Sequence, residues 1–178
     1  KPLAAPERFA LSSEPVLVNS APDGVTVLCP ITRPGTGWVE YGPGENLGMR
    51  ADGEVGGLLP YSDRLLSFRI TGLKPAEKYF YRVHACPIDF APGKRTTRGG
   101  EIQSAVFSFR TINPAASECS FTVWNDTHEN RDTIGALVNS LSKEPTDVLI
   151  WNGDVTNDLL DENRIVQQFI APAGQKGF

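Results

Sequence analysis

The chain has 178 residues, 40% of them hydrophobic and 21% charged, and a formal net charge of −4 at pH 7. This is the composition of an ordinary globular protein, with room for one large domain or two small ones. The negative charge and the lack of a basic run argue against a nucleic-acid-binding surface, and no apolar stretch is long enough to span a membrane.

The first 112 residues are predicted to form an all-β sandwich, which begins with an extended lead-in over residues 1–15. Short apolar runs alternate with turn-forming residues, and no amphipathic helix comes between them. Two stretches with little hydrophobic pattern, residues 46–60 and 87–100, are expected to be loops. We expect strands around residues 16–18, 25–29, 38–41, 65–70, 79–83 and 106–109.

The turn before the fifth of these strands carries a more specific pattern. Residues 73–79 have the sequence LKPAEKY, which resembles the tyrosine corner of fibronectin type III domains. The resemblance implies that the hydroxyl of Tyr79 hydrogen-bonds to the backbone a few residues upstream. It also implies that the sandwich is fibronectin III-like.

The cysteines and the first histidine of this half carry no clear motif. Cys29, Cys86 and Cys119 stand singly, which excludes a zinc ribbon because that site needs Cys-x-x-Cys spacing. Two interpretations of Cys29 and Cys86 stay open, a disulfide between facing strands or two small buried hydrophobic side chains. His84 is expected to be an ordinary histidine of the surface or of a loop.

Residues 113–178 begin with a short linker over residues 113–117 and are predicted to start an α/β domain. Apolar runs at residues 121–124 and 148–151 are short, β-rich and bounded by turn residues, so they are predicted to be buried strands. A strand, a helix and a strand of this length form a βαβ unit with parallel strands. The helix is predicted from the spacing of Ile134, Leu137, Val138 and Leu141.

A second helix is expected over residues 159–170, after the second strand. Asp158 precedes it as a candidate N-cap, and Ala171-Pro172 ends it. The side chains expected to pack on the sheet are those of Ile165, Val166, Phe169 and Ile170.

Two carboxylates and an imidazole follow the ends of the two parallel strands. Asp126 and His128 come after the first strand, and Asp154 comes after the second. Because adjacent parallel strands end at the same edge of a sheet, the three side chains are expected to converge there. Neither loop carries a Lys or Arg that would neutralise them. The cluster is therefore a candidate metal site, and its donors suit zinc, manganese or iron rather than calcium alone.

These loops resemble the opening motifs of the calcineurin-like metallophosphoesterases. Asp126-Thr127-His128 matches the Asp-x-His motif, and Gly153-Asp154 matches the second motif. The resemblance implies that Asp126 and His128 bind a first metal and that Asp154 bridges two metals. In the purple acid phosphatase branch, a metal-binding Tyr stands three residues after the bridging Asp. This chain has Asn157 there, so we expect no iron–tyrosinate site.

The departures from this family concern its later motifs. The purple acid phosphatase branch usually lacks the Asp-x-His histidine, although its secreted members often carry a fibronectin-like N-terminal domain. The family's Gly-Asn-His and Gly-His-x-His motifs are absent, because the only histidines are His84 and His128. We therefore expect this sequence to be the N-terminal part of a longer enzyme, with no catalytic residue of its own.

The resemblance also implies the cofactors, partners and compartment of the complete enzyme. It would hold two divalent metal ions, manganese, zinc or iron, and hydrolyse phosphomonoesters or phosphodiesters. This part alone would bind metal weakly, and its partner would be the remainder of the catalytic domain. The expected location, periplasmic or secreted, rests on the family and on the first residue, Lys1.

Two other interpretations stay open. The chain could be a non-catalytic interaction module built on the fibronectin-like domain. The three ligands could instead hold a single structural zinc or calcium ion, and removal of such a metal would lower thermal stability.

Overall fold

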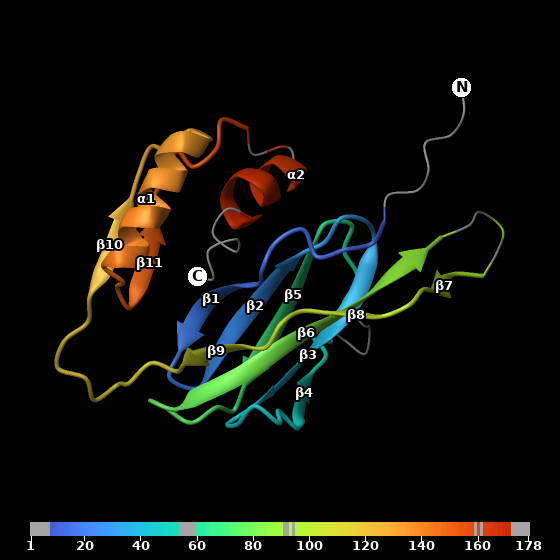
Figure 1. Ribbon diagram of the computed structural model, residues 1–178, viewed down its shortest axis with the longest axis horizontal. Coiled ribbons are helices and arrows are strands. Elements are labelled where there is room, and N and C mark those ends of the chain that lie inside the picture. The colour runs from blue at the N-terminus through green and yellow to red at the C-terminus, as the bar shows by residue number, and fades with distance from the viewer. Residues whose placement is uncertain are drawn as a thin grey trace.

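The computed structural model describes residues 8–53, 60–90, 93, 95–158, 160 and 162–171 (Figure 1). As predicted, the fold is rich in β-strands. The strands of the N-terminal half are β1 (Val16–Ala21), β2 (Gly24–Pro30), β3 (Gly35–Gly42), β4 (Met49–Ala51), β5 (Leu65–Thr71), β6 (Lys78–Asp89), β7 (Thr97–Arg98), β8 (Ile102–Gln103) and β9 (Phe107–Arg110).

These strands form two antiparallel sheets around one hydrophobic core. The first sheet has the order β1-β2-β5, and the second has the order β4-β3-β6-β7, with β8 and β9 also paired to β6. Because side chains alternate between the faces of a strand, every second residue of β2, β5 and β6 enters the core. The core residues of these strands include Val25, Val27, Phe68, Ile70, Tyr81 and Val83.

The predicted hydrogen bond of Tyr79 is present in the structure. The backbone N–H of Lys74 donates to the Tyr79 hydroxyl at 3.1 Å, and the ring of Tyr79 is buried in the core. The hydroxyl of Thr111, just after β9, donates to the Lys74 carbonyl at 2.6 Å. These bonds fasten the turn before β6 to the end of β9. The fibronectin type of the domain and its boundary at residue 112 stay predictions.

Several short strands occur where loops were predicted. β4 lies within residues 46–60, and β6 and β7 extend into residues 87–100. β4 pairs with β3, and β7 pairs with β6. Backbone N–H and C=O groups of β4 and β7 form hydrogen bonds with the neighbouring strand. These two strands can therefore form without a hydrophobic pattern of their own. Part of the first predicted loop, residues 54–59, lies outside the described residues.

His84 is buried in β6, so the prediction of a surface or loop histidine was wrong. Its Nε2 lies 2.8 Å from Oε2 of Glu40, and its Nδ1 lies 2.6 Å from Oε1 of Glu101. The ring stacks on Trp38, with 4.9 Å between centroids. These neighbours, from β3 and from the chain before β8, cover the outer face of the second sheet at this point.

Acidification is expected to destabilise the fold through the two glutamates. Hydrogen bonds from Arg82 and His84 lower the pKa of Glu40, and those from His84 and Gln103 lower the pKa of Glu101. Both carboxylates therefore bind protons less readily in the folded chain than in the unfolded chain. Their stabilising contribution is present above the ordinary glutamate pKa, about 4.3, and is lost as the pH falls through the lowered values.

The midpoint of urea unfolding, measured from about pH 6 to about pH 3, checks this expectation. Glu40→Gln removes one of the two carboxylates, so the midpoint of this variant should fall less on acidification than that of the parent. Glu45→Gln, at an exposed position between β3 and β4, should follow the parent. The explanation is wrong if the Glu40 variant and the parent lose stability equally.

The three cysteines are free thiols. Cys29 and Cys86 are buried and Cys119 is exposed. Cys29 is part of the core, where burial raises the pKa of its thiol to about 12. Cys86 instead accepts a hydrogen bond from Arg98 at 3.2 Å. Of the two interpretations of Cys29 and Cys86, the structure supports burial rather than pairing.

The predicted βαβ unit is present and consists of β10 (Phe121–Trp124), α1 (Arg131–Lys143) and β11 (Val148–Trp151). The strands are parallel neighbours, and Trp124 pairs with Trp151 at their carboxyl ends. Asn130 caps α1 by accepting a hydrogen bond from the Thr133 N–H at 3.0 Å. The helix covers one face of the two strands with Ile134, Val138 and Leu141.

No described residue covers the opposite face of β10 and β11, so the prediction of buried strands was wrong. Four apolar side chains lie on this face, and they are 38–63% exposed: Phe121, Val123, Val148 and Ile150. α1 packs in the cluster on the other face. Two-stranded parallel sheets with one bare apolar face are unusual, because parallel sheets are normally covered on both sides.

The final helical segment begins later than predicted. It consists of α2 (Glu162–Ile165) and the π-helical turn η1 (Val166–Ile170). Oδ1 of Asp158, the predicted N-cap, accepts a hydrogen bond from the Leu160 N–H at 2.8 Å in the turn before α2. No helix in the described part of the chain is both long and apolar enough to cross a membrane.

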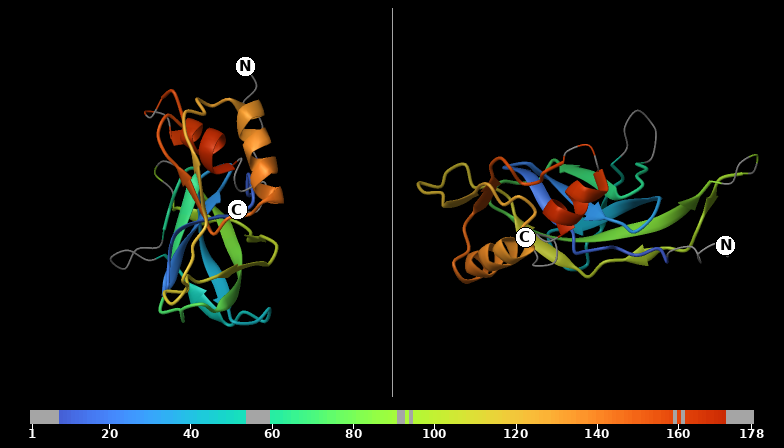
Figure 2. Two further views of the ribbon diagram at one scale, coloured as in Figure 1. Left: turned by 90° about the vertical axis from the view of Figure 1, so that its left-hand side faces the viewer. Right: turned by 90° about the horizontal axis from the view of Figure 1, so that it is seen from above.

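This segment packs mainly on the first antiparallel sheet, rather than on the parallel strands (Figure 2). Val166 and Ile170 contact a cluster formed by side chains of β1, β2 and β5. Phe169 also meets Trp151 of β11 edge-on, with 4.8 Å between ring centroids. The segment thus joins the first sheet to the βαβ unit.

Candidate metal centre

The loops that follow β10 and β11 run side by side. Their backbones continue the pairing of the strands: the Asn152 N–H donates to the Trp124 carbonyl at 2.7 Å, and the His128 N–H donates to the Asp154 carbonyl at 2.9 Å. This pairing brings residues that are 26 or more positions apart in the sequence to one edge of the sheet. The edge is the carboxyl end of both strands, where open α/β sheets bind ligands.

Thr127 sets the direction of the two residues beside it. Its side chain is buried, and its hydroxyl accepts a hydrogen bond from the indole N–H of Trp151 at 3.1 Å. Asp126 and His128, on either side of it, are exposed. A buried middle residue therefore leaves the carboxylate and the imidazole free to face a ligand.

The structure brings together all three side chains that the sequence analysis proposed as metal ligands. Asp126, His128 and Asp154 each offer one donor atom, and these atoms lie within 4.8 Å of one another. Oδ1 of Asp126 is 2.7 Å from Nε2 of His128. Carboxylate oxygen and imidazole nitrogen are the donors expected for manganese, zinc or iron, so the residues present fit such an ion. Their role as ligands stays a prediction.

The backbone of these loops is strained. Four non-glycine residues adopt a left-handed conformation, with φ of 60° at Asp126, 44° at His128, 63° at Glu129 and 45° at Asp154. Such conformations cost about 1–3 kcal/mol each and persist only where the surroundings hold them. They cluster at ligand sites, because a fixed unusual backbone can orient side chains before a ligand arrives.

Asn157 holds His128 from the other loop. Nδ1 of His128 lies 2.9 Å from Oδ1 of Asn157, and Nδ2 of Asn157 donates to the His128 carbonyl at 3.3 Å. The hydrogen bond with Asn157, and then the negative charges of Asp126 and Asp154, raise the pKa of His128. A single side chain thus contacts both the ring and the backbone of the histidine.

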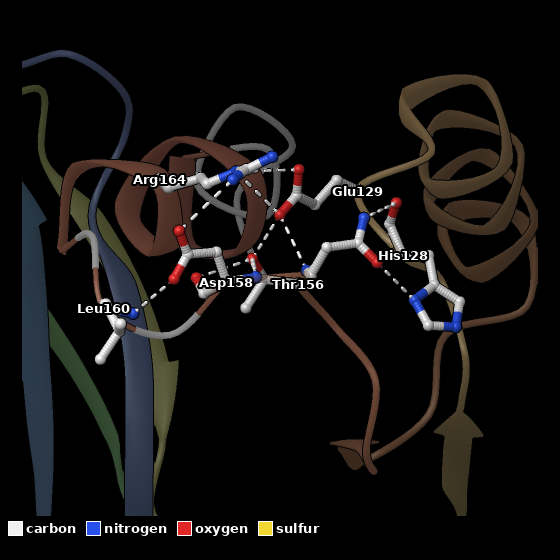
Figure 3. Close-up of polar contacts among 7 residues, drawn as sticks. His128, Glu129, Thr156, Asp158, Leu160 and Arg164 are labelled. Carbon is white, nitrogen blue, oxygen red and sulfur yellow. Dashed lines mark hydrogen bonds and ion pairs between the residues drawn. The ribbon is translucent and has the colours of Figure 1, made fainter.

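Glu129 joins the two loops to α2, as Figure 3 shows. Its side chain is only 11% exposed and lies 3.0 Å from Nε of Arg164. It accepts hydrogen bonds from the hydroxyl of Thr156 and, at 2.9 Å, from the backbone N–H of Asn157. These bonds, followed by the positive charge of Arg164, lower the pKa of Glu129.

The sequence analysis missed Glu129 and Arg164, and it considered Asn157 only as a substitute for Tyr. The sequence did contain one sign that Glu129 belongs to the site, because this residue directly follows the Asp-Thr-His motif. Its partner Arg164 is 35 residues away, in a helix whose position depends on the first sheet. No local pattern connects the two.

The fold resembles two solved structures at low sequence identity. One is a purple acid phosphatase, PPD1, isolated from yellow lupin (Lupinus luteus) seeds, with a TM-score of 0.56, 17% identity, and coverage of 94% of this chain and 34% of that chain. The other is PhoD, with a TM-score of 0.50, 12% identity, and coverage of 97% of this chain and 36% of that chain. At this identity the similarity is one of fold.

The chain spans about a third of the length of these two structures. No family model matches the sequence, and no curated protein matches it.

Proposed function

We propose that this chain supplies the first ligand loops of a metal-dependent phosphoesterase. The observation that carries the proposal is the convergence of Asp126, His128 and Asp154 at the carboxyl edge of β10 and β11. The fold similarity to a purple acid phosphatase supports the same class of chemistry. The substrate would be a phosphate ester, either a monoester or a diester.

The roles proposed for the three ligands are those that the resemblance to the metallophosphoesterases implies. Asp126 and His128 would hold one divalent ion, and Asp154, with two carboxylate oxygens, would be shared with a second. Manganese, zinc or iron bound there would lower the pKa of a bound water to about 7 and stabilise charge on phosphoryl oxygens.

The proposal also covers what this part of the enzyme lacks. His84 is held between two glutamates in the β-rich half, so it would not protonate a leaving group at this site. That step and the remaining ligands of the second metal would come from the rest of the catalytic domain. Asn157 is engaged with His128, which supports a site without iron–tyrosinate.

The proposed arrangement has a fibronectin III-like domain over residues 1–112 and the start of the phosphoesterase domain over residues 113–178. A location outside the cytoplasm, periplasmic or secreted, belongs to the same proposal.

A calorimetric titration of the purified chain with Mn²⁺ tests the proposed function. We expect binding with a Kd weaker than about 1 μM, because three exposed ligands leave much of the coordination shell to water. Hydrolysis of a chromogenic phosphodiester and monoester should appear only when the rest of the catalytic domain is present. Absence of any Mn²⁺, Zn²⁺ or Fe²⁺ binding would contradict the proposal.

A further inference from the structure

The imidazole of His128 has two different surroundings. Nε2 faces Asp126, on the side where Asp154 also contributes a donor atom. Nδ1 faces Oδ1 of Asn157 at 2.9 Å. A neutral imidazole carries its proton on only one nitrogen, so only the other nitrogen can bind a metal. Both nitrogens face oxygen atoms in this structure, so a metal on Nε2 requires the ring's proton to be on Nδ1, where the facing group must accept a hydrogen bond.

The orientation of the Asn157 amide is fixed by its second hydrogen bond. Its Nδ2 donates to the His128 carbonyl, which can only accept. The opposite amide atom, which faces Nδ1, must then be the oxygen. An oxygen at that place accepts a hydrogen bond from Nδ1–H, so the neutral ring has its lone pair on Nε2, the nitrogen that faces the carboxylates.

Asn157 is itself held in place from its backbone. Its N–H donates to Glu129 at 2.9 Å, and Glu129 is paired with Arg164 of α2. The neighbouring Thr156 donates a hydrogen bond to the same carboxylate (Figure 3). The amide that faces the imidazole is therefore attached to a part of the loop with several fixed contacts.

We propose that Asn157 is a positioning residue for the metal site: its amide oxygen keeps the Nδ1 proton of His128 and presents Nε2 to the ion. This inference rests on the proposed function and deepens it. Groups that hold the second nitrogen of a metal-binding histidine typically contribute 10–100-fold to metal affinity. Asn157 stands where the purple acid phosphatases have a metal-binding Tyr. In this chain the side chain at that position contacts the histidine instead of a metal.

The experiment compares Zn²⁺ affinity in four forms of the chain by calorimetry. Asn157→Leu removes both hydrogen bonds at similar volume and should weaken Zn²⁺ binding 10–100-fold. Asn157→Asp keeps an oxygen facing Nδ1 and should bind close to the parent. Asn152→Ala is the control, because this amide bonds to Asn125 in the same loops without touching His128. Circular dichroism of each form confirms that it is folded.

Long-range ¹H–¹⁵N correlation spectra of the Zn²⁺-loaded chain give a second readout, which a merely structural role would not change. In the parent and in Asn157→Asp, the proton should be on Nδ1 of His128 and the metal on Nε2. The chain has only two histidines, so the two imidazoles are readily distinguished by comparing metal-free and loaded spectra.

The outcomes separate the two proposals. If the parent binds Zn²⁺ but Asn157→Leu binds it as tightly, or if Zn²⁺ is on Nδ1 in the parent, the positioning role is wrong and the proposed function stands. If the parent binds no Zn²⁺ and no Mn²⁺, the proposed function fails, and the positioning role fails with it.

Discussion

Replacing Asp154 with asparagine is expected to reduce Mn²⁺ affinity by more than about 100-fold, as measured by calorimetry. Groups outside the ligand shell contribute 10–100-fold, and loss of a ligand should exceed that range. Asp154 is the only one of the three proposed ligands that comes from the loop after β11. Without its charge, the remaining donors are one carboxylate and one imidazole on a single loop.

The matched control for this prediction is Asp132→Asn. It makes the same chemical change in the first turn of α1, at an exposed position outside the ligand cluster. This variant should bind Mn²⁺ like the parent. In the complete enzyme, Asp154→Asn should also abolish hydrolysis. Unchanged Mn²⁺ affinity in the Asp154 variant would show that any bound metal lies elsewhere.

The same comparison separates a catalytic metal from a structural one. A single structural zinc or calcium ion would contribute to folding, so its loss in Asp154→Asn should lower the unfolding temperature. A site open to water and formed on preorganised loops should lose affinity with little change in the metal-free stability. Thermal unfolding with and without metal therefore completes the test.

Phe68→Ala is expected to destabilise the fold by about 3–5 kcal/mol. Phe68 is fully buried in β5, and its ring lies in the core between the two antiparallel sheets. Removal of the ring leaves a cavity that neighbouring side chains fill only in part. Because domains are typically stable by about 5–15 kcal/mol, this variant should be close to unfolding at 37 °C.

Phe121→Ala provides the control, since it removes the same ring from the uncovered face of β10, where Phe121 is 63% exposed. Its free energy of unfolding should change by about 0.5 kcal/mol or less. Urea unfolding measures both variants. Equal losses would mean that the bare face is covered in solution, or that the core around Phe68 rearranges to fill the space.

Local patterns predicted much of this fold. Alternating apolar residues predicted the main strands of the first half, and the spacing of Ile134, Val138 and Leu141 predicted α1. The meeting of Asp126, His128 and Asp154 followed from one rule, that parallel neighbours end at the same edge. The strands and α1 depend on residues close in sequence. The meeting of the three side chains depends on the βαβ topology, which short local patterns also predict.

The features that sequence analysis missed depend on contacts between distant segments. β4 and β7 are strands because a neighbour pairs with them, and their side chains carry no signal. His84 is buried because Glu40 and Glu101, 44 and 17 residues away, contact its two ring nitrogens, and Trp38 stacks on its ring. The roles of Glu129 and Asn157 likewise depend on how two loops and α2 meet.

The helical segment formed by α2 and η1 gives the molecule a thermodynamic link between its two halves. Val166 and Ile170 are packed on the first sheet, and Arg164 of the same segment holds Glu129 beside the metal loops. A ligand that binds the metal loops of the folded chain, but not the unfolded chain, stabilises the folded state by mass action. Part of that stabilisation should reach β1, β2 and β5 through the helix. Amide protons of these strands should then exchange more slowly with solvent when the loops are occupied.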